Sequence, residues 1–284
     1  MGIAFAFLAL IFWGIGDFLI QRSVRKFGDW IMIFYIDLIG VIMFTPFVFK
    51  TLIPTVRKPD DLVILLVAST VLLFAALVDF EALKNGKISV VEPIFAFEVP
   101  VTAILAYFFI QERITVPELS LILVLVVGIA LVATKSWRHF RLKIEKGVLL
   151  AILTTIFMGT ANFLFGFGGR QTDPWLINWF TSAFLALVSL IYILSKGQAG
   201  LILQDWRINK NLITQVSIYD NLAWLFFTFS ILYIPIAIAT GISESYIALA
   251  ALLGLVFNGE KLARHQWLGL IICSIAAVIL AIIV

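Results

Sequence analysis

Ten long apolar runs divide this 284-residue chain, and they constrain its fold more than any other feature. A helix needs about 20 mainly apolar residues, at about 1.5 Å each, to cross a hydrocarbon core of about 30 Å. Hydrophobic residues make up 62% of the chain and charged residues 13%, so a soluble fold could not cover the apolar surface. We therefore predict an all-α integral membrane protein with ten transmembrane helices. The predicted spans are residues 3–21, 30–49, 62–83, 88–110, 116–134, 147–168, 175–195, 212–233, 235–257 and 266–284.

The ten predicted helices divide into two repeats of five. Short motifs recur in the same order in both halves: residues 11–19 match residues 156–164, and residues 109–113 match residues 257–261. Because each half has an odd number of spans, the second must insert upside down relative to the first, which is a recurrent transporter architecture. The predicted units are a first repeat at residues 1–134, a basic connecting loop at 135–146 and a second repeat at 147–284.

The distribution of basic residues bears on how the protein lies in the membrane. With a cytoplasmic N-terminus, only five of the 20 Lys and Arg residues fall in cytoplasmic segments, so the positive-inside rule favours both termini outside. The first apolar run lacks a basic region before it, and we read it as a retained helix rather than a signal peptide. We expect a multi-pass protein of a prokaryotic inner membrane.

Three motifs carry a resemblance to a known family. They are Phe12-Trp13-Gly14 in the first helix, the segment 82–86 leading into Pro93, and Glu112-Arg113-Ile114-Thr115 at the end of the fourth helix, which residues 260–262 repeat in the second half. In these motifs the chain resembles the drug/metabolite transporter superfamily, and specifically its ten-helix EamA-type branch.

The resemblance implies alternating access between two inverted five-helix halves around a central cavity. It implies that helices 1, 3 and 4 and their counterparts 6, 8 and 9 line this cavity, with helices 2 and 7 outside it. It also implies cytoplasmic termini, against the charge count, so the orientation stays open. Family members move amino acids, nucleosides, sugar phosphates, choline and other amines, so the resemblance does not choose the substrate.

Nine of the 17 acidic residues fall inside predicted spans, where an ionised side chain costs at least about 2.5–3.5 kcal/mol, and eight of them are candidates once Glu118, in the first turn of its span, is set aside. No Lys or Arg shares these deep positions, so we expect the acids to be protonated, hydrated in a cavity or bound to a mobile cation. Each state suits a path for protons or positively charged solutes and argues against anionic substrates. The eight acids are Asp17, Asp37, Asp79, Glu81, Glu92, Glu98, Asp220 and Glu244.

Glu98 in the fourth predicted helix is the strongest single candidate. It lies two residues before Pro100, whose missing N–H we expect to kink the helix. Glu244 lies at equivalent depth in the ninth helix, so each half offers one central carboxylate. The alternative is a pair of neutral acids that hydrogen-bond neighbouring helices and only hold the bundle together.

The remaining polar candidates follow from the repeat and from helix geometry. Asp17 and Asn162 occupy matching positions in the two repeats, which suggests that both line a cavity. Asp79 is favoured over Glu81, because side chains two residues apart on a helix diverge by about 200°. Asp37 ranks below these, since the resemblance places the second helix outside the cavity.

Four aromatic residues lie deeper than the belt of Trp and Tyr expected at the membrane interfaces. Near carboxylates such rings could hold an ammonium group by cation–π contact, at about 0.5–2 kcal/mol each, although core packing is the more common explanation for any one of them. Glu112 and Glu260, at the matched helix ends, we interpret as caps or loop ion pairs. The full set of candidate substrate- or proton-binding residues is Glu98, Glu244, Asp17, Asp79, Glu92, Asp220, Asn162, Trp13, Tyr246, Trp224 and Tyr35.

These features predict a secondary active transporter for a small polar, amine-bearing metabolite, with proton coupling left open. An exporter of neutral amino acids or other metabolites is the alternative, and a flippase for a lipid-linked substrate ranks lower. An enzyme is disfavoured, because His139 and His265 both lie in loops and neither has a metal-ligand spacing. We expect no cofactor, metal or nucleic acid, a small-molecule partner, and a monomer or homodimer.

Overall fold

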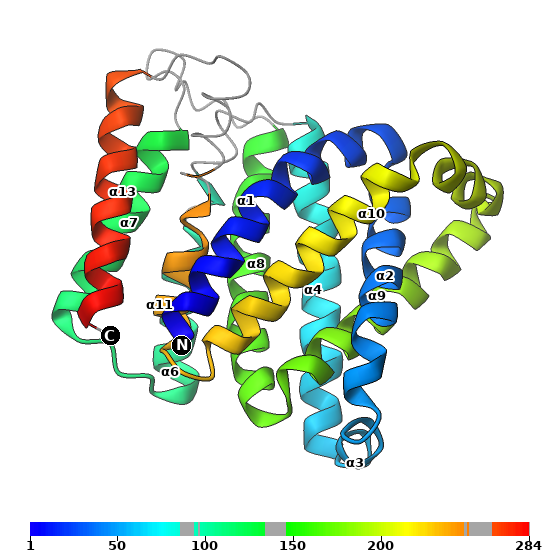
Figure 1. Ribbon diagram of the computed structural model, residues 1–284, viewed down its shortest axis with the longest axis horizontal. Coiled ribbons are helices and arrows are strands. Elements are labelled where there is room, and N and C mark those ends of the chain that lie inside the picture. The colour runs from blue at the N-terminus through cyan, green and yellow to red at the C-terminus, as the bar shows by residue number, and fades with distance from the viewer. Residues whose placement is uncertain (86–93, 96, 134–145, 247–248, 250–262, 284) are drawn as a thin grey trace.

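The computed structural model describes residues 1–85, 94–95, 97–133, 146–246, 249 and 263–283, and the regular elements in these ranges are helices (Figure 1). Both termini lie at the same end of the bundle. The helices, in chain order, are α1 (Gly2–Phe27), α2 (Asp29–Val48), α3 (Leu52–Val56), α4 (Pro59–Asn85), α6 (Glu98–Ile110), α7 (Val116–Ala133), α8 (Lys146–Gln171), α9 (Pro174–Ser195), α10 (Ala199–Ser230), α11 (Ile236–Ser243) and α13 (Arg264–Ile283).

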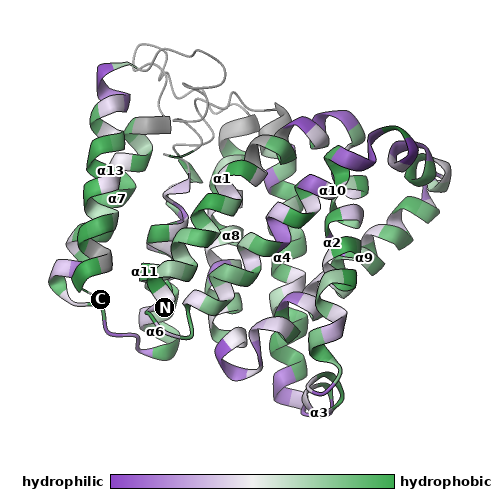
Figure 2. Ribbon diagram, in the orientation of Figure 1, coloured by the Kyte–Doolittle hydropathy of each residue, from purple (hydrophilic) through white to green (hydrophobic). Residues whose placement is uncertain are grey.

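The outer surface of the bundle suits a lipid solvent. Four of the described helices, α2, α4, α8 and α9, are long and apolar enough to cross a membrane. Large apolar side chains stand exposed, such as Phe108 at 71% and Val116 at 78%, which water would penalise and hydrocarbon accepts. Figure 2 shows green, apolar ribbon over most of the helix lengths and purple, polar ribbon toward the ends of the bundle. This is a multi-pass membrane protein.

The strongest helix contacts join the two halves of the chain. Helix α1 packs on α10, α2 on α9, α4 on α8, and α7 on α13, so each pair takes one helix from each half. Weaker contacts also join the two halves. Helix α6 of the first half packs on α8 of the second, and helix α11 of the second half packs on α1 of the first. The prediction of an all-helical membrane fold built from two inverted five-helix halves is confirmed.

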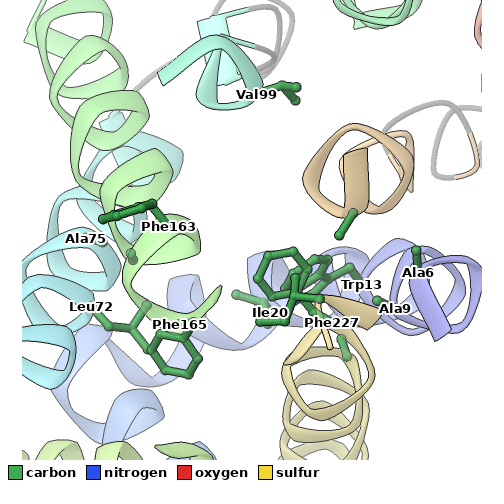
Figure 3. Close-up of a cluster of buried hydrophobic side chains, with 14 of the residues drawn as sticks. Ala6, Ala9, Trp13, Ile20, Leu72, Ala75, Val99, Phe163, Phe165 and Phe227 are labelled. Carbon is green, nitrogen blue, oxygen red and sulfur yellow. The ribbon is translucent and has the colours of Figure 1, made fainter. Parts of the chain in front are cut away.

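Aromatic side chains fill the centre where these pairs cross. Figure 3 shows Trp13 of α1 packed with Phe227 of α10, and their ring centroids lie 5.6 Å apart. Trp224 meets Phe165 of α8 at 4.7 Å, so the same cluster reaches across to the α4–α8 pair. The cluster also reaches Leu72 of α4, and all but Trp224 of these side chains are at least nine-tenths buried. The aromatic cluster therefore joins α1 and α10 to α4 and α8.

One local expectation from the sequence, a kink at Pro100 within a continuous helix, was wrong. Helix α6 begins at Glu98, which places Pro100 in the first turn, where the missing N–H would have had no partner within the helix. Pro100 therefore does not kink a continuous helix. The polar stretch 196–211, expected to connect two spans, is helical from Ala199 and forms the first part of α10, with non-helical dihedral angles at Asn209.

Helix α9 starts with a well-formed N-terminal cap. The side chain of Asp173 accepts hydrogen bonds from the backbone N–H groups of Trp175 (2.9 Å) and Leu176 (3.1 Å), and Pro174 occupies the first helical position. Proline fits there because its fixed φ suits the helix and its missing N–H costs nothing.

We expect Asp173→Ala to lower the free energy of unfolding by about 0.5–2 kcal/mol, because two backbone N–H groups lose their acceptor. Thermal unfolding in detergent measures the change. Asp173→Ser keeps an acceptor oxygen and serves as the control, with most of the wild-type stability. Equal melting temperatures for Asp173→Ala and the wild type would show that the cap contributes nothing.

Candidate functional site

A cavity of about 130 Å³ lies between the two halves, at the level of the aromatic cluster. An engineered apolar cavity of about 150 Å³ in another protein accepts benzene, so this cavity suits a small solute. Helices α1, α2, α4 and α6 of the first half and α8, α9, α10 and α11 of the second contribute to its wall. The lining residues are Trp13, Ile20, Ile33, Ile36, Asp37, Leu72, Ala76, Asp79, Phe80, Phe95, Glu98, Met158, Asn162, Phe165, Asn178, Thr181, Ser182, Leu185, Asp220, Asn221, Trp224, Glu244 and Tyr246.

The polar part of this wall is acidic. It includes five carboxylic acids, while the described lining residues include no Lys, Arg or His. Glu98, Glu244 and Asp37 are at most 8% exposed. A cavity with such a wall favours a cation or a proton over an anion, because a buried negative charge needs a compensating positive one. The five acids are Asp37, Asp79, Glu98, Asp220 and Glu244.

The lining positions of the two halves correspond through the sequence repeat. Five pairs of lining residues have the same spacing in the sequence. They are residues 13 and 158, 20 and 165, 33 and 178, 36 and 181, and 37 and 182. Positions on α4 and α10 keep this spacing, since Ala76 matches Asn221 and Asp79 matches Trp224. The cavity is therefore built on the pseudo-twofold relation between the halves, although its chemistry differs from one half to the other.

Asp37 lies in the cavity wall, which corrects the expectation that helices 2 and 7 lie outside it. The Ser182 hydroxyl of α9 donates a hydrogen bond to Asp37, and Asp220 of α10 is close enough to act on Asp37 electrostatically. Helices α2 and α9 reach the cavity because they pack on each other across the pseudo-twofold axis. Gly40, one turn beyond Asp37, leaves room for the side chains of Asn221 and Ser182.

This acidic pair is not a requirement of the packing. The position in the first half that matches Asp220 is Ala75, which is fully buried, and the position that matches Asp37 is Ser182. The positions related to Asp220 and Asp37 by the repeat therefore carry small, uncharged side chains, Ala75 and Ser182. Asp37 and Asp220 give the cavity a charge that the fold itself does not need.

Glu98 and Glu244 lie at the inner ends of two short helices. Glu98 is the first residue of α6, and Glu244 caps the C-terminus of α11. Helix α6 packs tightly on α8 at Gly159: its Thr102 hydroxyl donates to the Gly159 carbonyl oxygen (2.9 Å). Asn162 follows on the next turn of α8, and its Nδ2 donates to Glu244 Oε1 at 3.4 Å. These contacts bring α6, α8 and α11 together around one part of the cavity.

The amide oxygen of Asn162 is buried and has no hydrogen-bond partner among the described residues. Asn162 is 1% exposed and belongs to the cavity wall. Turning the amide over would place this oxygen against the Glu244 carboxylate, which is repulsive when that group is ionised, so the orientation with Nδ2 toward Glu244 is the better one. A buried acceptor without a hydrogen-bond partner destabilises the folded protein by about 1–3 kcal/mol.

Aromatic rings form the apolar part of the wall. Trp13 and Trp224 meet edge to face, with ring centroids 5.2 Å apart, and Tyr246 lies 6.3 Å from Trp13. Tyr246 is two residues beyond Glu244, and Trp224 is one turn beyond Asp220. The rings therefore come from the same chain segments as Asp220 and Glu244.

The structure brings eight of the residues predicted from sequence into one wall: Glu98, Glu244, Asp79, Asp220, Asn162, Trp13, Trp224 and Tyr246. Tyr35 is not part of it, because its hydroxyl donates to the Ile202 carbonyl oxygen and its ring stacks on Trp206. Glu92 and the side chain of Asp17 lie outside the described part of the chain. Asn178, Thr181 and Ser182 also line the cavity and were not predicted, although extending the Asp17–Asn162 spacing to Asp37 would have reached Ser182.

At the end of the bundle that carries the termini, an ion pair ties the halves together. Arg170 at the end of α8 contacts Glu112 just beyond α6 at 2.9 Å, and also donates to the carbonyl oxygens of Ile231 (2.7 Å) and Ile234 (2.8 Å). Glu112 accepts from the first backbone N–H of α11, at Ile236 (2.8 Å). The interpretation of Glu112 as a cap and ion pair is confirmed, and Glu260 lies outside the described residues.

The fold and the site define a class: a membrane protein whose two inverted halves enclose an acidic cavity for a small solute. The EamA-like transporter family matches the chain twice, over residues 1–134 and 145–282, and the protein belongs to this family. The resemblance seen in the sequence motifs is thereby confirmed, and the family is one of transporters rather than enzymes.

The chain is also similar to two further proteins. An uncharacterized protein of Methanocaldococcus jannaschii is 25% identical over 131 residues, which span 45% of this chain and 93% of that protein. A crystal structure of a protein that is 13% identical superposes with a TM-score of 0.79 and covers 99% of this chain and 96% of that one. At this identity the superposition shows a shared fold.

Proposed function

We propose that this transporter is a secondary active carrier that moves a small polar, amine-bearing metabolite through the cavity by alternating access. The halves rock about the aromatic cluster, and the cavity is reached from one side of the membrane and then from the other. Substrate and proton compete for Glu98 and Glu244, which couples the two fluxes. We place the protein in a prokaryotic cell membrane, in keeping with the archaeal source of its half-length relative.

One observation carries this proposal: the described cavity wall contains five carboxylic acids and no basic residue. A protonated amine compensates these acids, whereas a sugar phosphate or another anion would meet only like charge. The acids at Asp37 and Asp220 support the proposal further, because their counterparts in the other half are uncharged. The aromatic wall gives an amine a cation–π surface of about 0.5–2 kcal/mol per ring.

The test is uptake of labelled amines and amino acids into proteoliposomes, with and without a pH gradient, for the wild type and Glu98→Gln. We expect the wild type to take up an amine in response to the gradient, and Glu98→Gln to lose that response. Glu118→Gln is the matched control, since Glu118 lies outside the cavity and accepts from the backbone N–H of Thr115 at the start of α7 (2.6 Å).

Other outcomes select the alternatives. Unchanged gradient-driven uptake in Glu98→Gln would remove that residue from the coupling. Uptake of neutral amino acids alone would favour an exporter in which the acids hydrate or pack the bundle. Movement of a lipid-linked substrate between leaflets, without uptake of soluble amines, would indicate a flippase.

A further inference from the structure

We infer that the transported molecule is a primary amine, whose N–H groups are bound by the amide oxygen of Asn162 together with the carboxylates of Glu244 and Glu98. This inference rests on the proposed transport of a cation and adds the chemistry of its head group. It separates amines that carry N–H donors from quaternary ammonium compounds, which carry the same charge without any donor.

The unsatisfied acceptor on Asn162 is the first observation. Its Oδ1 is buried and has no partner among the described residues, while its Nδ2 faces Glu244 Oε1 at 3.4 Å. Buried polar groups are nearly always hydrogen-bonded, so an exception in the wall of a cavity points to a ligand that completes it. The missing partner must be a donor, because an amide oxygen can only accept.

The neighbours of Asn162 narrow the choice to a positively charged donor. Glu244 touches the Asn162 amide, and Glu98 stands at the start of α6, which packs on α8 one turn before Asn162. Helix α11 ends at Ser243, so the negative end of its dipole lies beside Glu244. Acids and a helix C-terminus both favour a cation over a neutral alcohol or amide.

An ammonium group fits this set because it has three N–H donors and three acceptor groups are at hand. A quaternary ammonium would satisfy the charge but leave the Asn162 oxygen unpaired, at a cost of about 1–3 kcal/mol. Trp13 and Tyr246, whose ring centroids lie 6.3 Å apart beside the same acids, also offer apolar surface, which an organic cation can bury and a bare metal ion cannot. The rings favour a head group with an organic body.

Two cations of nearly equal size and shape test the inference. Tert-butylammonium and tetramethylammonium each have five heavy atoms in a tetrahedron and one positive charge, but only the first has N–H donors. We expect tert-butylammonium chloride to bind the wild type about tenfold more tightly or better. The measurement is thermal stabilisation of the purified protein in nanodiscs across a concentration series, with competition against amine uptake as the second readout.

Substitution of Asn162 connects the preference to this residue. Asn162→Leu keeps the volume and removes the acceptor, and should reduce the ratio of the two affinities at least about threefold. Asn162→Gln keeps the amide oxygen without adding charge and should retain the ratio. Thr160→Val is the matched control: Thr160 lies on the same helix as Asn162 but outside the described cavity wall, and its hydroxyl donates to the Ile156 carbonyl oxygen (2.7 Å), so the ratio should not change.

Three results would overturn the inference: equal binding of the two cations by the wild type, an unchanged ratio in Asn162→Leu, or equal protection by sodium chloride. Tert-butanol, the neutral molecule of the same shape, separates this failure from failure of the proposed function. If tert-butanol binds as well as both cations, cation transport itself is refuted. If both cations bind equally and tert-butanol does not, cation transport stands and the primary-amine inference falls.

Discussion

Gly40→Ala should reduce amine uptake at least about tenfold and lower the melting temperature. A Cβ at this position would collide with Asn221 Oδ1 and lie 2.6 Å from Ser182 Oγ. Helix α2 would have to move away from α9 and α10, and overpacking of this kind costs about 1–3 kcal/mol. Asn221 would also lose the hydrogen bond that it donates to the Ile36 carbonyl oxygen (2.8 Å), and the wall around Asp37 would change shape.

The control for this substitution is Gly16→Ala on α1. A Cβ there has its nearest neighbour at 3.5 Å, an ordinary contact, and alanine in a helix interior is favoured over glycine by about 0.5–1 kcal/mol. Gly16→Ala should therefore be neutral or stabilising. Initial uptake rates in proteoliposomes and melting temperatures in detergent measure both variants. Wild-type behaviour of Gly40→Ala would mean that Asn221 and Ser182 can move aside at no cost.

Arg170→Ala should open the end of the bundle that carries the termini. The substitution removes one ion pair and two hydrogen bonds to the carbonyl oxygens at residues 231 and 234, and bonds to charged groups contribute about 1.5–3 kcal/mol each. Among the described residues, Glu112 would keep only the N–H groups at the start of α11. We expect a lower melting temperature and a larger population in which the cavity is reached from this end.

Thiol labelling reports that opening. The one cysteine of the chain, Cys273, is buried, and replacing it with alanine gives a background without thiols. Gly169→Cys in this background places a thiol beside Ile231 and Thr228, where a new side chain has room. A water-soluble maleimide should react several-fold faster in the Arg170→Ala variant. Lys58→Ala is the control, because the Lys58–Asp61 pair is a surface contact of about 0–1 kcal/mol. Equal labelling rates in all three proteins would refute the role of Arg170.

The architecture could be predicted from the sequence because the bilayer imposes a simple length rule on apolar runs. The repeat was visible because Gly14 and Gly159, and the residues around them, keep the same order in both halves. The central acids were found for the same reason: a carboxylic acid inside a span has few explanations other than a cavity.

The rest of the site depends on contacts that no single helix encodes. Asp37 ranked low because the family resemblance placed the second helix outside the cavity, whereas the packing of α2 on α9 brings Asp37 into the wall. Tyr35 ranked too high, since depth along a helix does not say which face the side chain occupies. The partner of Glu112 is 58 residues away at Arg170, beyond the reach of local sequence patterns.

The exchange of helices between the halves sets the order in which the protein can be assembled. Helices α1, α2, α4 and α7 all find their main partners in the second half. The ribosome needs on the order of ten seconds to synthesise that half, at about 5–20 residues per second. During this interval the first five helices are in the membrane without the surfaces they pack against. Biogenesis therefore passes through an inserted but unpaired half, and this half is the species most exposed to quality-control proteases.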